Sequence, residues 1–105
     1  MSKPEFQWIN GRLVNEDGWA TSDGGREGLF YEEKSRKYWA EWIYDPTSKT
    51  SLIGLYRYCW DAPFDNERIS HAEIIVIVER ICLALRFKGE TRFKVTLPNE
   101  EEIIL

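Results

Sequence analysis

The sequence predicts an α+β fold, in which an antiparallel sheet of about five to six strands carries one long helix packed on one face. One segment, residues 71–88, has apolar residues at helical spacing together with helix start and stop signals. Several short segments alternate apolar and polar residues and are separated by turn residues. Because strands precede the helix and one strand follows it, with short connections, a helix on an antiparallel sheet is the expected architecture.

The N-terminal third is predicted to contain a hairpin, a loop and a strand. Residues 7–15 form the hairpin, since Asn10-Gly11 suits the two positive-φ positions of a type I′ turn. Residues 16–27 are expected to be a loop. A strand over residues 28–32 then enters a second turn at residues 33–35.

Three longer strands are predicted in the rest of the chain. Residues 36–44 alternate, so that one face is apolar and the other is mixed. A strand over residues 52–60 has apolar groups on both faces, and residues 91–97 form the most regular alternation before Pro98 ends it. In residues 36–44 the apolar face consists of Tyr38, Ala40, Trp42 and Tyr44, and the mixed face of Lys37, Trp39, Glu41 and Ile43.

Both ends of the helix are signalled. Ser70 is the expected N-cap and Glu73 completes a capping box, while Gly89 fits the left-handed position after the last turn. One stripe faces the sheet, and a second apolar set points the opposite way, where solvent or a partner would meet it. The first stripe is Ile74, Ile77, Val78, Ile81 and Leu85, and the second set is Val76, Leu83 and Phe87.

Length and composition favour one globular domain over residues 1–105. The chain has 105 residues, of which 43% are hydrophobic and 30% are charged, as in ordinary folded proteins. Residues 98–105 begin with an acidic run and end in Ile103-Ile104-Leu105. They form either a short tail or a segment that docks back onto the domain.

Charge and hydropathy exclude several classes of function. The 14 Lys and Arg against 18 Asp and Glu give a net charge of −4, which argues against a nucleic-acid partner. The start of the chain lacks a signal-peptide core, and the longest aliphatic run, residues 74–78, is far shorter than the ~20 residues of a membrane span. We therefore expect a cytoplasmic protein without a membrane partner, in which Cys59 and Cys82 are free thiols.

The sequence carries no specific catalytic, metal or cofactor signature. His71 is the single histidine and lies at the start of the helix. Asp61, Asp65 and Glu67 share one loop but lack the glycine and the spacing of a calcium loop. We predict no catalytic residue, no metal and no cofactor. A small enzyme or ligand-binding domain with a cleft near Glu41, Arg57 and His71 stays open as an alternative.

The aromatic content is high for a core of this size. Aromatic residues make up 14% of the chain and include five tryptophans. If the helix covers the face with Tyr38, then Trp39 and Ile43 lie on the opposite face, beside either Ile53, Leu55 and Arg57 or Tyr56, Tyr58 and Trp60. Either the N-terminal hairpin folds over that face, or the sheet curls on itself, or a partner covers it.

Residues 28–95 resemble a family of small α+β immunity proteins of bacterial polymorphic toxin systems. The resemblance covers about two thirds of the chain. It rests on the strand Gly28-Leu-Phe-Tyr31, Arg36 and Glu41 in the next strand, Trp60-Asp-Ala-Pro63, the helix opened by Ile69-Ser70 and Glu73, Gly89, and the final strand to Val95.

The resemblance implies a protein that binds a cognate toxin of the same cell and blocks it without turnover. An acidic domain with spare aromatic surface suits a basic toxin such as a nuclease. The alternative is a self-associating adaptor or structural domain, a homodimer closed through the bare sheet face or the Val76-Leu83-Phe87 set. In the first reading the acids of the loop form the rim, with Trp60 or Trp39 nearer the centre. The expected partner-binding residues are Trp39, Glu41, Arg57, Trp60, Asp61, Asp65 and Glu67.

Overall fold

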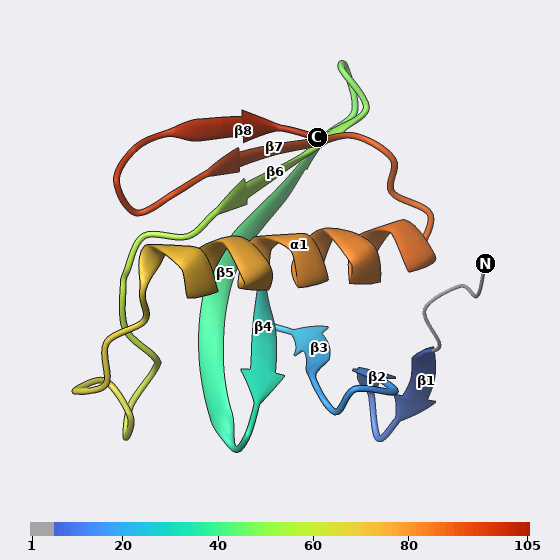
Figure 1. The fold of residues 1–105 in the computed structure, drawn as a ribbon. Coiled ribbons are helices and arrows are strands. Elements are labelled where there is room, and N and C mark those ends of the chain that lie inside the picture. Colours follow the sequence, from blue (N-terminus) through green and yellow to red (C-terminus); the bar gives the residue numbers. More distant parts are fainter. Residues whose placement is uncertain (1–5) are drawn as a thin grey trace.

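The computed structural model describes residues 6–105 and has an α+β architecture with one helix and one open sheet (Figure 1). The sheet has eight strands rather than the expected five to six, and they lie side by side in chain order. The elements are β1 (Phe6–Ile9), β2 (Arg12–Asn15), β3 (Ala20–Asp23), β4 (Gly28–Glu33), β5 (Arg36–Asp45), β6 (Thr50–Gly54), α1 (His71–Phe87), β7 (Phe93–Thr96) and β8 (Glu102–Ile104).

The sheet is mixed, which corrects the expectation of a purely antiparallel sheet. Strands β1 to β6 form an antiparallel meander, and β7 pairs with β8 in the same antiparallel manner. The exception is β7, which runs parallel to β6, with Ile53 opposite Val95. The cause is α1, because a helix that returns the chain across the sheet brings the next strand in parallel to the last.

Strand β3 lies in the segment that we expected to be a loop. Of its four residues, Ala-Thr-Ser-Asp, only threonine favours strands. The strand forms because it pairs with a strand on each side. Thr21 lies between Leu13 of β2 and Tyr31 of β4, and it is 4% exposed. Tertiary pairing therefore overrides the local sequence here.

The strand expected over residues 52–60 ends at Gly54. Beyond it the Tyr38 hydroxyl donates a hydrogen bond to the carbonyl oxygen of Arg57 (2.7 Å) and accepts one from the Arg57 N–H (3.1 Å). One side chain thus satisfies backbone groups that a neighbouring strand would otherwise bind. Further on, a single bridge joins Cys59 to Arg68.

The C-terminal segment is docked rather than free. Leu97 N–H donates to the Glu101 carbonyl (2.8 Å), and Phe93 and Leu105 exchange two backbone hydrogen bonds of 3.0 and 2.9 Å. Residues 102–104 consequently form β8 at one edge of the sheet. Of the two alternatives for residues 98–105, the docked segment is the one observed.

The helix agrees with its sequence signals. The Ser70 Oγ accepts from the Glu73 N–H (3.1 Å) while the Glu73 carboxylate accepts from the Ser70 N–H (3.2 Å), which is a complete capping box. After the C-cap Lys88, Gly89 has φ of 106°. The buried side of α1 forms the core with the facing strands, and consists of Ile74, Ile77, Val78, Ile81, Cys82, Ala84 and Leu85.

The sheet curls around α1, and the N-terminal hairpin takes part in this curvature (Figure 1). Strand β1 is an edge strand, so the hairpin extends the sheet instead of folding over its outer face. It also meets the end of the helix, where the rings of Phe6 and Phe87 are 5.1 Å apart. The Lys88 ammonium lies 5.5 Å from the ring centroids of both Trp8 and Trp42, which ties β1 to β5 across the helix end.

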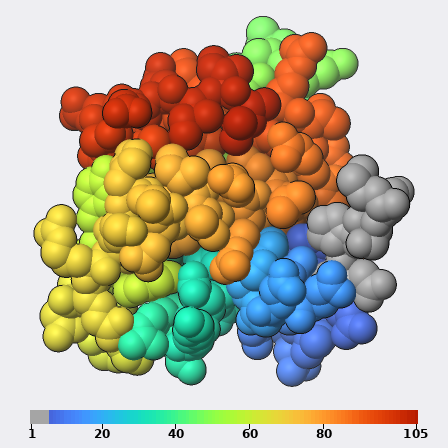
Figure 2. Space-filling view, viewed as in Figure 1, coloured from blue at the N-terminus to red at the C-terminus, as the bar shows by residue number. Residues whose placement is uncertain are grey.

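The helix remains visible across the middle of the molecule in Figure 2, between the C-terminal strands and the N-terminal part. Its second apolar set lies on this open side. Val76 is 43%, Leu83 36% and Phe87 51% exposed.

Candidate protein-binding surface

The sheet face turned away from α1, here called the outer face, carries two rows of side chains across β5 to β8. The strand registers align one row with a carboxylate at each end and a second, more apolar row beside it. Alternate residues of the same strands, such as Ala40, Ile53 and Val95, belong to the core, which fixes the orientation of the rows. The first row is Glu41, Gly54, Thr96 and Glu102, and the second is Ile43, Leu52, Lys94 and Ile104.

Tyr56 lies over this face, and Gly54 makes room for it. A Cβ atom on Gly54 would lie 2.3 Å from the Tyr56 hydroxyl oxygen, so a side chain there would displace the ring. The Tyr56 hydroxyl donates to Glu41 Oε1 at 2.8 Å, and this hydrogen bond to the carboxylate raises the pKa of Tyr56 above its ordinary value. The hydroxyl end of the ring is held by Glu41 above Gly54, and Tyr56 is 57% exposed.

Trp39 is seated in the same way on the neighbouring strands. A Cβ atom on Gly28 would come within 2.3 Å of the indole ring, and the indole N–H donates to the Gly24 carbonyl at 2.9 Å. The outer face therefore presents two aromatic rings in fixed positions, each above a glycine. Rings that are already ordered lose little freedom when a partner covers them.

Two adjoining hollows follow the outer face beside Tyr56. The smaller has a volume of about 190 Å³ and the larger about 690 Å³, and they share Leu52 and Lys94. Ile43 lines the first, while Ile104 and Leu105 line the second. The floor is apolar in part, and Glu41 and Glu102 both line the smaller hollow.

The chain matches no family model, no curated protein and no solved structure. Among residues 6–105, no helix has both the length and the apolar character that crossing a membrane requires.

Trp60, one of the two expected anchors, belongs to the core. It is 6% exposed, and its ring stacks on that of Tyr31 with centroids 6.4 Å apart and planes 17° apart. Burial raises the pKa of Tyr31 to about 12. A partner cannot contact a side chain in this position without opening the fold, so of the two rings only Trp39 lies on the outer face.

Arg57 and Asp61 pair with each other. Their shortest contact, from Nη1 to Oδ1, is 2.7 Å. The Arg57 guanidinium also donates from Nη2 to the Trp39 carbonyl (3.2 Å) and lies 4.7 Å from the ring centroid of Tyr38. These contacts hold the segment after β6 against β5, which is a structural role.

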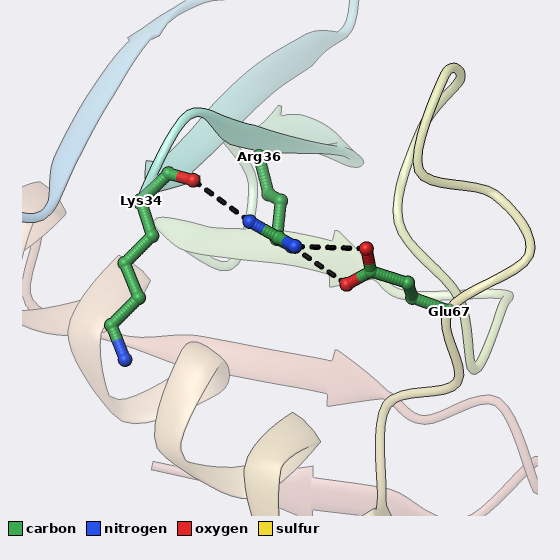
Figure 3. A network of polar contacts seen from close by, with 3 residues as sticks. All are labelled: Lys34, Arg36 and Glu67. Carbon is green, nitrogen blue, oxygen red and sulfur yellow. Dashed lines mark hydrogen bonds and ion pairs between the residues drawn. The ribbon is translucent and has the colours of Figure 1, made fainter.

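Glu67 is bound in an ion pair with Arg36 at the β4–β5 turn (Figure 3). Two hydrogen bonds join them, from Nε at 2.7 Å and from Nη2 at 2.8 Å, and the guanidinium also donates to the Lys34 carbonyl. The arginine holds the pKa of Glu67 below its ordinary value. Asp61 and Glu67 are therefore neutralised by internal partners, and Asp65 alone of the three loop acids is exposed without a described ion pair.

The Glu67 pair predicts a dependence of stability on pH. Because the pKa of Glu67 is lowered in the folded protein, the pair contributes stability above the unfolded pKa of a glutamate, and this contribution is lost as pH falls through the lower, folded value. We expect Glu67→Gln to flatten the decrease of Tm between about pH 5 and pH 3, measured by circular dichroism. Asp65→Asn in the same loop is the control, and a Glu67→Gln profile as steep as that of the wild type would contradict the pair's role.

The three residues of the alternative enzyme reading have different partners. His71 Nδ1 is 3.0 Å from the Tyr58 hydroxyl, beside a hollow of about 490 Å³ at the start of α1. Glu41 lines the outer face and Arg57 pairs with Asp61. Within residues 6–105, no three or more His, Cys, Asp or Glu side chains form a group that could hold a metal ion. Cys59 and Cys82 are free, and burial raises the pKa of Cys82 to about 11.

Sequence reasoning placed Trp39 and Glu41 correctly on one face and offered Tyr56 as one of two alternative neighbours, but it missed Leu52, Lys94, Glu102 and Ile104. Leu52, Tyr56, Lys94, Glu102 and Ile104 come from three strands and one irregular segment. Their juxtaposition depends on the parallel pairing of β6 with β7 and on β8, which no local pattern announces. The apolar end Ile103-Ile104-Leu105 after the acidic run is compatible with a docked segment but does not indicate which strand it pairs with.

Proposed function

We propose that this protein is an immunity protein that binds and neutralises a cognate bacterial toxin without catalysing a reaction. The observation that carries the proposal is the outer face, where Trp39 and Tyr56 are held above glycines beside two part-apolar hollows. Tryptophan, tyrosine and arginine are the residue types that most often dominate binding energy in protein interfaces. A face of this kind suits a protein partner better than a small substrate.

Charge supports a basic partner. The chain carries a net charge of −4, and Glu41 and Glu102 flank the outer-face hollow that also contains Lys94. Opposite charge speeds the encounter of two proteins and fixes their orientation. In this proposal the acidic contribution comes from Glu41 and from Glu102, whose contact with Lys94 is 3.4 Å, because Asp61 and Glu67 are held in shorter ion pairs of 2.7 Å with Arg57 and Arg36.

Self-association is the second candidate function. The observation in its favour is the exposed set Val76, Leu83 and Phe87 on the open side of α1. A two-fold dimer would bury this set against its copy and would leave the outer face free. The two candidates thus use opposite sides of the molecule.

Co-expression with the toxin domain encoded next to its gene tests the proposed function. We expect a one-to-one complex by size-exclusion chromatography with light scattering, and growth of cells in which the toxin domain alone is lethal. A homodimer that ignores the neighbouring domain, together with unrelieved toxicity, would refute the proposal and favour self-association.

A further inference from the structure

Strand β8 is an edge of the sheet, with β7 on one side only. Phe93 and Leu105 exchange backbone hydrogen bonds with each other, and the register sets Val95 opposite Ile103. Backbone groups of an antiparallel strand alternate in direction along the chain. The N–H and C=O groups of Ile103 and Leu105 therefore point to β7, and those of Glu102 and Ile104 point away from the sheet. The C-terminal strand lies along one margin of the molecule in Figure 2.

The side chains of this edge are accessible as well. Ile104 is 77% exposed, the highest value among the exposed large hydrophobic residues, and Glu102 is exposed beside it. Both lie on the outer face, where Glu102 lines the smaller hollow and Ile104 the larger. Exposed apolar side chains next to unpaired backbone groups make an edge competent to pair with another strand.

We propose that β8 binds an extended segment of the partner protein by strand addition, and that this segment carries basic residues in the half that faces residues 100–102 and apolar residues in the half that faces Ile104. The backbone groups of Glu102 and Ile104 supply the hydrogen bonds. Three consecutive carboxylates, Glu100, Glu101 and Glu102, favour basic side chains, and Ile104 favours an apolar one. The inference rests on the proposed function only in naming whose segment this is.

A second copy of the chain fits this edge less well than a basic strand. In antiparallel pairing of two β8 strands centred on Ile103, Glu102 of each copy would face Ile104 of the other, so the carboxylates of residues 100–102 would gain no cation. Lys94 is already 3.4 Å from Glu102 of its own chain. A basic segment supplies the cations that a second copy lacks.

Hydrogen exchange measured by NMR tests the strand addition directly. The probe is a capped nine-residue peptide with lysines in one half and valines in the other, and in the control peptide glutamates replace the lysines. In the free protein we expect the amides of Glu102 and Ile104 to exchange at least about tenfold faster than those of Ile103 and Leu105. The lysine peptide should slow the first two amides by about tenfold or more, and the glutamate peptide should not. Unchanged exchange at Glu102 and Ile104, or equal effects of both peptides, would overturn the proposal.

One substitution removes an outward donor without touching the β7 pairing. Proline is tolerated on edge strands where the N–H would face solvent, so Ile104→Pro should keep the fold while it weakens lysine-peptide binding by about tenfold or more. Ile104→Ala keeps the N–H and should bind more tightly than Ile104→Pro. Ile103→Pro is the matched control, because it breaks a bond to β7 and should lower Tm. Equal peptide affinities of Ile104→Pro and Ile104→Ala would contradict the backbone contribution.

The two proposals fail in different ways. If Ile104→Pro binds the toxin domain as tightly as the wild type, strand addition is wrong and the immunity function stands. If the lysine peptide protects the amides of Glu102 and Ile104 but no toxin domain is bound, strand addition at β8 is supported and the immunity function is wrong.

Discussion

Replacing Trp60 by alanine should lower the free energy of unfolding by about 3–5 kcal/mol, the range seen for large aromatic side chains deleted from cores. Trp60 is 6% exposed and stacked on Tyr31, which is itself fully buried. Deletion of the indole would leave a cavity beside Tyr31 and would remove a packing contact of the segment that leads to α1. Urea denaturation followed by far-UV circular dichroism measures the loss.

Trp39→Ala is the matched control for this prediction. The indole of Trp39 is half-buried on the outer face and contacts Gly28 and the Gly24 carbonyl, so we expect a loss of about 1–2 kcal/mol. A larger loss for Trp39→Ala than for Trp60→Ala would contradict the assignment of Trp60 to the core and of Trp39 to the surface.

The helix could be predicted from sequence because its signals are local. Ser70, Glu73 and Gly89 mark its ends through contacts with residues a few positions away, and the observed bounds of His71–Phe87 differ from the expected 71–88 by one residue. The first hairpin is similarly local. Asn10 and Gly11 have φ of 50° and 77°, as a type I′ turn requires.

The elements that sequence reasoning missed depend on distant partners. Strand β3 is stabilised by pairing on both sides, and β8 by bonds between residues such as Phe93 and Leu105. Strand β6 ends at Gly54, before the expected residue 60, because the Tyr38 hydroxyl binds the backbone of Arg57, 19 residues away. Such competition is invisible to a pattern read along the chain.

The same reason explains the fate of the loop acids. Asp61 and Glu67 looked like a solvated rim in the sequence, but Arg57 lies four residues from one and Arg36 lies 31 residues from the other. The first partner was within reach of a local argument. The second partner, Arg36, lies at the start of β5, which only the fold brings close to the loop. The acids that we propose for partner binding on the outer face are therefore Glu41 and Glu102.

Tyr56→Ala should weaken binding of the toxin domain by about 30-fold or more, which corresponds to a loss of about 2 kcal/mol at an interface hot spot. Tyr56 combines a 57% exposed ring with a fixed position above Gly54 and a hydrogen bond to Glu41. Because the ring is largely exposed in the free protein, unfolding should change by no more than about 0.5–1 kcal/mol. Isothermal titration calorimetry and urea denaturation separate the two effects.

Three further variants locate the binding energy. Tyr56→Phe keeps the ring and loses the hydrogen bond to Glu41, so its affinity should lie between those of wild type and Tyr56→Ala. Gly54→Ala keeps the ring but displaces it, since its new Cβ would meet the hydroxyl end, and should weaken binding as Tyr56→Ala does. Leu83→Ala, 36% exposed in the wild type on the opposite side of the molecule, should leave binding unchanged. Leu83 and Tyr56 lie on opposite sides of the molecule, so one partner domain cannot contact both. If Leu83→Ala weakens binding and Tyr56→Ala does not, the binding surface is the open side of α1 and not the outer face.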